Sequence, residues 1–153
     1  MALAAGDKAP NFKLESDAGR VSRTSLKGKP YIVYFYPKDN TSGCTKEACD
    51  FSAAAAKFDK AGIFVLGVSK DSLESHAKFK AKHKLKIALG SDPDVEMAKD
   101  WGVWGEKTLY GRKFMGVERS TFLVDAKGVI ARAWRKVKVP GHAAAVLEAA
   151  RAL

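Results

Sequence analysis

Cysteine and histidine are scarce in this chain, which has 153 residues but only 2 cysteines, Cys44 and Cys49, and 3 histidines. A structural zinc site usually draws four ligands from two closely spaced pairs of cysteine or histidine, and no such spacing is present. The Cys-x4-Cys pair also differs from the Cys-x-x-Cys redox motif. We therefore expect no metal site.

The chain also lacks long apolar runs and recognisable targeting or cofactor segments. No run approaches the roughly 20 residues needed to span a bilayer. The first ten residues, MALAAGDKAP, have neither the basic region nor the apolar length of a signal peptide. No glycine-rich phosphate loop offers a seat for a nucleotide or flavin. We expect a cytoplasmic protein without a cofactor or membrane partner, in which two cysteines serve redox chemistry more often than structural cross-linking.

What is present is typical of a globular protein: 46% hydrophobic and 29% charged residues. The length predicts a single domain over residues 1–153. A net charge of +10 is compatible with nucleic-acid binding, and five lysines alternate with other residues between Lys78 and Lys86. That alternation spreads them around a helix, so a solvated surface is the preferred interpretation and no specific nucleic-acid partner is expected.

Strand and helix patterns alternate along the chain. Apolar runs predict strands at 31–36, 63–68 and 87–89, and helical spacing predicts helices at 44–60, 71–83, 93–101 and 143–153. Hairpins are predicted from 11–14 with 19–22 and from 121–124 with 129–134, whereas 102–116 has the glycine content of a loop. This order predicts a three-layer α/β/α sandwich with a mixed central sheet and an N-terminal β-hairpin.

The chemistry is concentrated in Tyr31–Phe51, where an apolar strand leads through a polar loop into a helix. This places Cys44 in the first helical turn, where unpaired backbone N–H groups and the helix dipole favour an anion. A thiolate is such an anion, and cysteines at helix starts are often reactive for this reason. Apolar positions Ala48, Phe51, Ala55 and Phe58 share a face with Cys44 and direct it toward the protein body.

Cys49 follows Cys44 at i+5, which is about 140° around the helix and roughly 8.6 Å away between Cα atoms. Disulfides need Cα atoms closer than about 7 Å. The two cysteines can be joined only if the first turns of the helix unwind. The sequence therefore predicts a switch between a reduced helical state and an oxidised, locally unfolded state.

The segment PKDNTSGCTKEACDF resembles the active-site segment of peroxiredoxins of the bacterioferritin comigratory protein, or peroxiredoxin Q, type. The resemblance continues through GVWGEK at Gly102–Lys107 and ERSTFLVDAKG at Glu118–Gly128, and covers nearly the whole chain. It implies a thioredoxin-like fold. One position departs from the family pattern, because Ser42 stands where proline usually precedes the glycine; serine can still cap a helix.

The resemblance also implies the roles of individual residues. Cys44 would be the nucleophile that attacks a hydroperoxide, and Cys49 the resolving cysteine that forms an intramolecular disulfide with it. The Thr41 hydroxyl would hydrogen-bond the thiolate and the peroxide, Arg119 would stabilise both, and Pro37 would shield the thiolate from water.

One further residue and the partners complete this interpretation. Glu47, on the first helical turns, could orient the arginine. A thioredoxin-like dithiol would be the reductant, and the family type suggests a monomer. Two alternatives remain at this point: a redox-sensing thiol protein on the same fold, or a basic nucleic-acid-binding protein.

Overall fold

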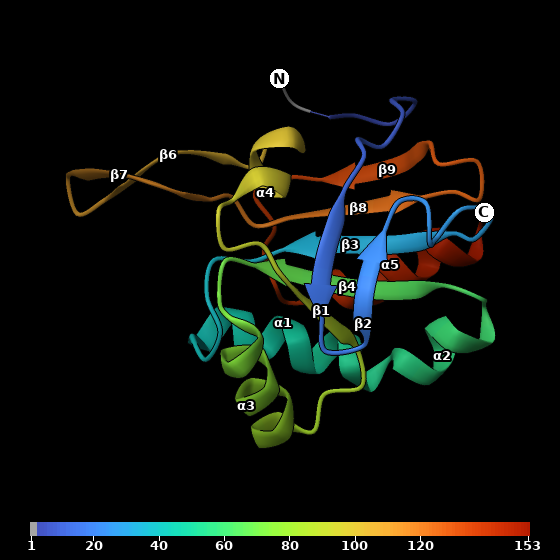
Figure 1. Ribbon diagram of the computed structural model, residues 1–153, viewed down its shortest axis with the longest axis horizontal. Coiled ribbons are helices and arrows are strands. Elements are labelled where there is room, and N and C mark those ends of the chain that lie inside the picture. Colours follow the sequence, from blue (N-terminus) through green and yellow to red (C-terminus); the bar gives the residue numbers. More distant parts are fainter. Residues whose placement is uncertain (1–2) are drawn as a thin grey trace.

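A computed structural model describes residues 3–153 of the chain (Figure 1). Residues 1 and 2 lie outside the described residues. They belong to the N-terminal stretch in which we expect no signal peptide. Within residues 3–153, no helix combines the length and the apolar character that crossing a membrane requires.

A mixed sheet of seven strands organises the fold, in the order β2-β1-β5-β4-β3-β8-β9. The three central strands β5, β4 and β3 are parallel, whereas β8 and β9 add to them antiparallel and β1 pairs antiparallel with β5. The strands are β1 (Lys13–Ser16), β2 (Gly19–Ser22), β3 (Tyr31–Phe35), β4 (Phe64–Ser69), β5 (Ala88–Ser91), β8 (Ser120–Val124) and β9 (Ile130–Trp134).

Strand β3 is buried on both faces, so its apolar residues do not alternate with polar ones. Tyr31, Val33 and Phe35 face one hydrophobic core, which also contains Trp101. Ile32 and Tyr34 face a second core. This core also contains Cys44, together with Ala48 and Phe51 of the same helix. The continuous apolar run that predicted this strand is explained by these two cores.

The second core is covered by helices α1 (Ser42–Ala53), α2 (Ala55–Lys60), α3 (Leu73–His83) and α5 (His142–Arg151). The first core is covered by the short helix α4 (Glu96–Asp100) and the N-terminal segment. Helices and loops therefore lie on both faces of the mixed sheet, as the element order predicts.

The prediction of a loop over 102–116 is wrong. These residues form a two-stranded hairpin of β6 (Trp104–Leu109) and β7 (Arg112–Val117), which projects from the body (Figure 1). Tyr110 and Gly111 form its turn, with φ of 52° and 75°. Two positive φ values match the type I′ turn that favours tight hairpins. The hairpin escaped the pattern analysis because its strands are largely exposed and carry no apolar alternation.

Three helix boundaries also differ from the sequence predictions. The expected helix over 44–60 is divided at Ala54 into α1 and α2. Helix α3 is capped by Ser72, whose hydroxyl accepts a hydrogen bond from the Ser75 N–H, and not by Asp71. Helix α4 begins at Glu96 and not at Pro93, because Val95 adopts a left-handed conformation with φ of 52°.

The surface lysines of α3 form ion pairs. Lys78 pairs with Glu74 one turn earlier, and Lys80 pairs with Asp17 in the turn between β1 and β2. These contacts agree with the interpretation of the lysine-rich segment as a solvated surface.

The pairing of β3 with β8 brings distant parts of the sequence together. Phe35, at the end of β3, lies opposite Ser120 at the start of β8. The loop that follows β3 leads into α1, and Arg119 directly precedes β8. The residue implied to stabilise the thiolate therefore lies beside the N-terminus of the helix that carries the thiol.

We expect the substitution Gly67→Ala to destabilise the fold. A Cβ atom at Gly67 would lie 2.7 Å from Cζ of Tyr34, whose ring also stacks on Phe51 with centroids 4.7 Å apart. Overpacking of this kind costs about 2 kcal/mol of the free energy of unfolding, measurable by urea denaturation. Gly105→Ala is the matched control, because its Cβ would meet no atom within 4 Å. Equal stability of both variants would contradict this packing.

Candidate active site

The Cys44 side chain lies at the start of α1 and is buried, with 1% of the residue exposed. Thr41 is the N-cap residue, and the first helical hydrogen bond runs from the Thr45 N–H to the Thr41 carbonyl at 2.8 Å. The Thr41 side chain makes no capping hydrogen bond to the first turn of the helix. The sequence prediction of a cysteine in the first helical turn is confirmed, although Ser42 does not serve as the cap.

Arg119 connects the sulfur to a buried carboxylate. Its Nη2 donates to Sγ of Cys44 at 3.2 Å, and its Nη1 donates to Oε1 of Glu47 at 2.6 Å. The Glu47 side chain is only 1% exposed and that of Arg119 is 17% exposed. The expectation that Glu47 orients Arg119 thus matches the geometry, and the guanidinium directs one donor at the sulfur.

Gly43 permits this approach. A Cβ atom at position 43 would lie 3.2 Å from Nη2 of Arg119, closer than most Cβ contacts. The glycine just before Cys44 therefore leaves space for the guanidinium beside Sγ.

The charges of the site depend on burial. Burial raises the pKa of Glu47 to about 7, and the adjacent Arg119 guanidinium opposes this rise. Burial acts to lower the pKa of Arg119, but the Glu47 carboxylate and the Cys44 sulfur outweigh burial and raise it. Arg119 therefore stays protonated, and it places a positive charge beside the Cys44 sulfur.

Among residues 3–153, the hydrogen bond to the Cys44 sulfur comes from Arg119, and none comes from the other site residues implied by the resemblance. The Thr41 hydroxyl is exposed and donates to the Lys38 carbonyl at 3.0 Å. Pro37 is half-buried where β3 gives way to the loop. Cys49 is half-buried in the same helix, and both cysteines are free thiols. The structure thus brings Cys44, Glu47 and Arg119 into contact and leaves Thr41 facing its own loop.

A second polar cluster was not identified from the sequence. Asp39, in the loop between β3 and α1, contacts Tyr36 and His76 in the buried interior. Asp39 and His76 are 37 residues apart in the chain, so no local pattern could have paired them. Among residues 3–153, no group of three or more histidine, cysteine, aspartate or glutamate side chains is arranged to hold a metal ion.

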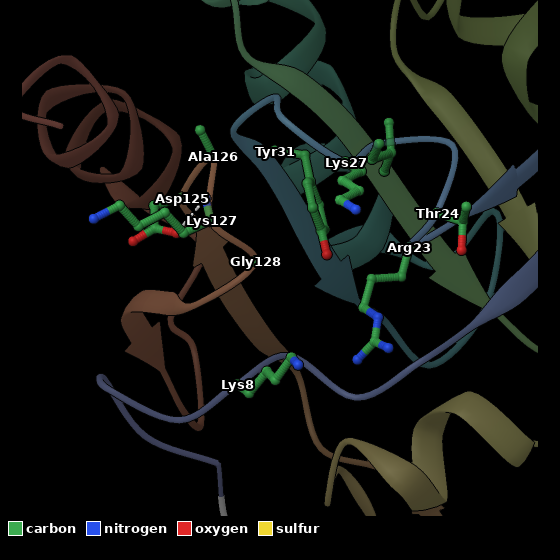
Figure 2. Close-up of a pocket in the computed structure, with 10 residues that line it drawn as sticks. Lys8, Arg23, Thr24, Lys27, Tyr31, Asp125, Ala126, Lys127 and Gly128 are labelled. Carbon is green, nitrogen blue, oxygen red and sulfur yellow. Dashed lines mark hydrogen bonds between the residues drawn. The ribbon is translucent and has the colours of Figure 1, made fainter.

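A cavity of about 310 Å³ lies at the other end of β3, around the first residue of that strand, Tyr31. Figure 2 shows the basic side chains of Lys8, Arg23 and Lys27 around it. Cys44 follows the opposite end of β3. The cavity is therefore separate from the cysteine site.

Comparison with known proteins places this arrangement in a family. Residues 5–133 match the AhpC/TSA family. A putative peroxiredoxin bcp of Coxiella burnetii is 49% identical over 148 residues, covering 96% of this chain and 98% of the relative. Peroxiredoxin Bcp of Bacillus subtilis is 45% identical, covering 97% and 95%. The chain belongs to the peroxiredoxin family.

Solved structures support the same assignment. Peroxiredoxin Q of Xanthomonas campestris superposes with a TM-score of 0.87 at 46% identity, covering 92% of this chain and 90% of the other. Peroxiredoxin Q of Xylella fastidiosa gives a TM-score of 0.92 at 38% identity, covering 99% and 98%. The thioredoxin-like peroxiredoxin fold and the assignment to the bacterioferritin comigratory protein type are confirmed. This peroxiredoxin is a thiol-dependent peroxidase.

The raised pKa of Glu47 predicts a pH-dependent stability. The folded peroxiredoxin releases the Glu47 proton near pH 7, whereas the unfolded chain releases it near 4.5. The folded state therefore holds more protons between these values, and its free energy of unfolding decreases as pH rises from about 4.5 to about 7. Glu47→Gln removes that contribution, so we expect the stability difference between parent and variant to change by roughly 3 kcal/mol across the interval.

Urea denaturation of the reduced proteins at pH 4.5 and 7.5 measures this difference. Glu106→Gln is the control, since Glu106 is exposed on the β6–β7 hairpin. Parallel pH dependence in the parent and the Glu47→Gln variant would show that folding does not raise the pKa of Glu47.

Proposed function

We propose that Cys44 is the peroxidatic cysteine of this peroxiredoxin and that Cys49 resolves its oxidised form. The observation that carries the proposal is the contact between Nη2 of Arg119 and Sγ of Cys44 at 3.2 Å, with the same guanidinium held by Glu47. A charged donor at the sulfur supports both the thiolate and a negative charge that develops beside it.

In the first step the Cys44 thiolate attacks one oxygen of a hydroperoxide, ROOH. The new S–O bond yields a sulfenic acid as the O–O bond breaks, and the leaving alkoxide takes a proton to become ROH. Arg119 already directs Nη2 toward the sulfur, so this donor can hydrogen-bond the departing oxygen. The unpaired N–H groups at the start of α1 lie beside the same region.

Thr41 and Pro37 have supporting roles in this proposal. Thr41 is the residue immediately before α1, and rotation of its hydroxyl away from the Lys38 carbonyl would present it to a bound peroxide. Pro37 lies at the base of the loop and limits access of water to the buried sulfur.

In the second step the Cys49 thiol condenses with the sulfenic acid, forming a disulfide and releasing water. Both cysteines lie within one continuous helix, α1, in the reduced structure. Ideal helix geometry puts their Cα atoms roughly 8.6 Å apart, beyond disulfide range. The first turns of α1 must therefore unwind before the bond can form.

The disulfide must then be reduced by two electrons from an external dithiol. We assign this role to a thioredoxin-like protein. We further propose that the peroxiredoxin is a cytoplasmic monomer and that residues 1–153 form one domain. As substrate we propose hydrogen peroxide and alkyl hydroperoxides. A solved structure of the Xanthomonas campestris bacterioferritin comigratory protein, 45% identical over 92% of this chain, is described in terms of alkyl peroxide reduction.

We expect Cys49→Ser to separate the two steps. With one equivalent of peroxide the variant should oxidise Cys44 at the parent rate, whereas its thioredoxin-dependent turnover should fall at least about tenfold, because no disulfide forms. Stopped-flow fluorescence and peptide mapping by mass spectrometry measure both effects. Cys44→Ser is the control and should not react. Undiminished turnover of Cys49→Ser would refute its role as the resolving cysteine.

We expect Arg119→Lys to slow the reaction of Cys44 with peroxide about 10²-fold, since lysine lacks the forked donors that reach Sγ and Glu47 together. The second-order rate constant with hydrogen peroxide is the readout. Arg132→Lys serves as the control, because Arg132 lies over the Trp134 ring, 4.9 Å from its centroid, and does not contact the site. A rate within twofold of the parent would contradict the role of Arg119.

A further inference from the structure

The loop that precedes α1 is attached to the protein interior through the carboxylate of Asp39, whose side chain is 2% exposed. The Tyr36 hydroxyl donates to Oδ1 of Asp39 at 2.7 Å, and the Ser75 hydroxyl donates to Oδ2 at 2.8 Å. Nδ1 of His76, a fully buried residue of α3, lies 2.7 Å from Oδ2. One carboxylate therefore connects the loop, the end of β3 and helix α3.

The partners of His76 determine its protonation. Nε2 lies 2.9 Å from the carbonyl oxygen of Gly90 in β5. A carbonyl oxygen only accepts hydrogen bonds, so Nε2 must carry a proton. Nδ1 faces a carboxylate oxygen that already accepts from Ser75, while the other oxygen accepts from Tyr36. This arrangement suits an ionised carboxylate opposite a second ring proton, and His76 is then an imidazolium.

The effects on the pKa values agree with this ion pair. Burial acts to lower the pKa of His76, but the hydrogen bond and charge of Asp39 outweigh it and raise that pKa. Burial acts to raise the pKa of Asp39, but the hydrogen bonds from His76 and Tyr36 outweigh it and lower that pKa. A second carboxylate, Asp71, accepts a hydrogen bond from the Asp39 N–H at 2.9 Å and also favours the charged histidine.

The start of α1 depends on this attachment. The N-cap residue Thr41 makes no side-chain capping bond, and its hydroxyl bonds to Lys38 within the same loop. Local capping therefore does not fix the first turn. Asp39 lies five residues before Cys44, and it is tied by its side chain to His76 of α3 and by its N–H to Asp71 in the loop that starts α3. His76 in turn contacts the Gly90 carbonyl of β5.

We propose that Asp39, Tyr36 and His76 are positioning residues of the peroxidase reaction: their buried ion pair and hydrogen bonds hold the loop before Cys44 in place while α1 unwinds and refolds. The inference rests on the proposed function, in which the first turns of α1 must unwind. It identifies the residues that keep the preceding loop in place during that step. Unwinding then starts after the anchored loop, and the helix reforms with Sγ beside Arg119.

The substitution Asp39→Asn tests this role because it keeps the shape of the carboxylate and removes its charge. Its amide can donate to Nδ1 of a neutral His76, which keeps Nε2–H on Gly90. We expect the rate constant of Cys44 with hydrogen peroxide to fall about tenfold, since small displacements of a reacting group have large effects on rate. In NMR spectra at pH 7, the His76 ring should carry two N–H protons in the parent and one in the variant.

Two further variants complete the experiment. Glu74→Gln breaks the exposed Glu74–Lys78 pair on the same helix and should react within twofold of the parent. Tyr36→Phe removes one hydrogen bond to Asp39 and should slow the reaction about threefold; it decides the test if Asp39→Asn does not fold.

The proposal is overturned by a single N–H proton on the His76 ring of the parent, by parent-like rates in both Asp39→Asn and Tyr36→Phe, or by an equal loss of rate in Glu74→Gln. Failure of the proposed function itself has a different signature. In that case the parent would not form a sulfenic acid or disulfide at Cys44, whatever the protonation of His76.

Discussion

The contact of the Arg119 guanidinium with the Cys44 sulfur and the Glu47 carboxylate is the interaction on which the proposed chemistry of this protein depends. It is possible only because β8 pairs with β3, so that the residue before β8 lies beside the helix that follows β3. The thiol and the positive charge lie at the same end of this pairing, because the thiol follows β3 and the arginine precedes β8. Burial of Glu47 strengthens its Coulomb attraction to Arg119, but it also removes water from the carboxylate and raises its pKa.

A second constraint acts in the opposite direction. The helix that presents Cys44 to Arg119 also holds Cys49 too far away for a disulfide. The reduced site must therefore be ordered enough to fix the sulfur and weak enough to open. The structure meets both demands with a helix start that lacks a side-chain cap, next to a loop held by the buried Asp39 and His76 pair. In the proposed mechanism the loop stays anchored while the first turn of the helix opens.

Much of this arrangement follows from the sequence. The apolar run at Tyr31–Phe35 and the polar loop after it predict the strand and the helix start, because burial and helix termini leave strong local patterns. The approach of Arg119 to Cys44 joins residues 75 apart and was expected only through resemblance to a family. Local patterns also miss the Asp39–His76 pair, which depends on the packing of α3, and the β6–β7 hairpin, whose strands are exposed along most of their length.

The central claim is that one helix alternates between an ordered state that reacts with peroxide and an opened state that holds the disulfide. Amide hydrogen exchange of the reduced and the disulfide forms, compared residue by residue, tests it most directly. We expect oxidation to abolish protection across the N-terminal turns of α1, while β3, β8 and the Asp39 amide stay protected. Equal protection of α1 in both forms would show that the disulfide forms without unwinding and would contradict this account.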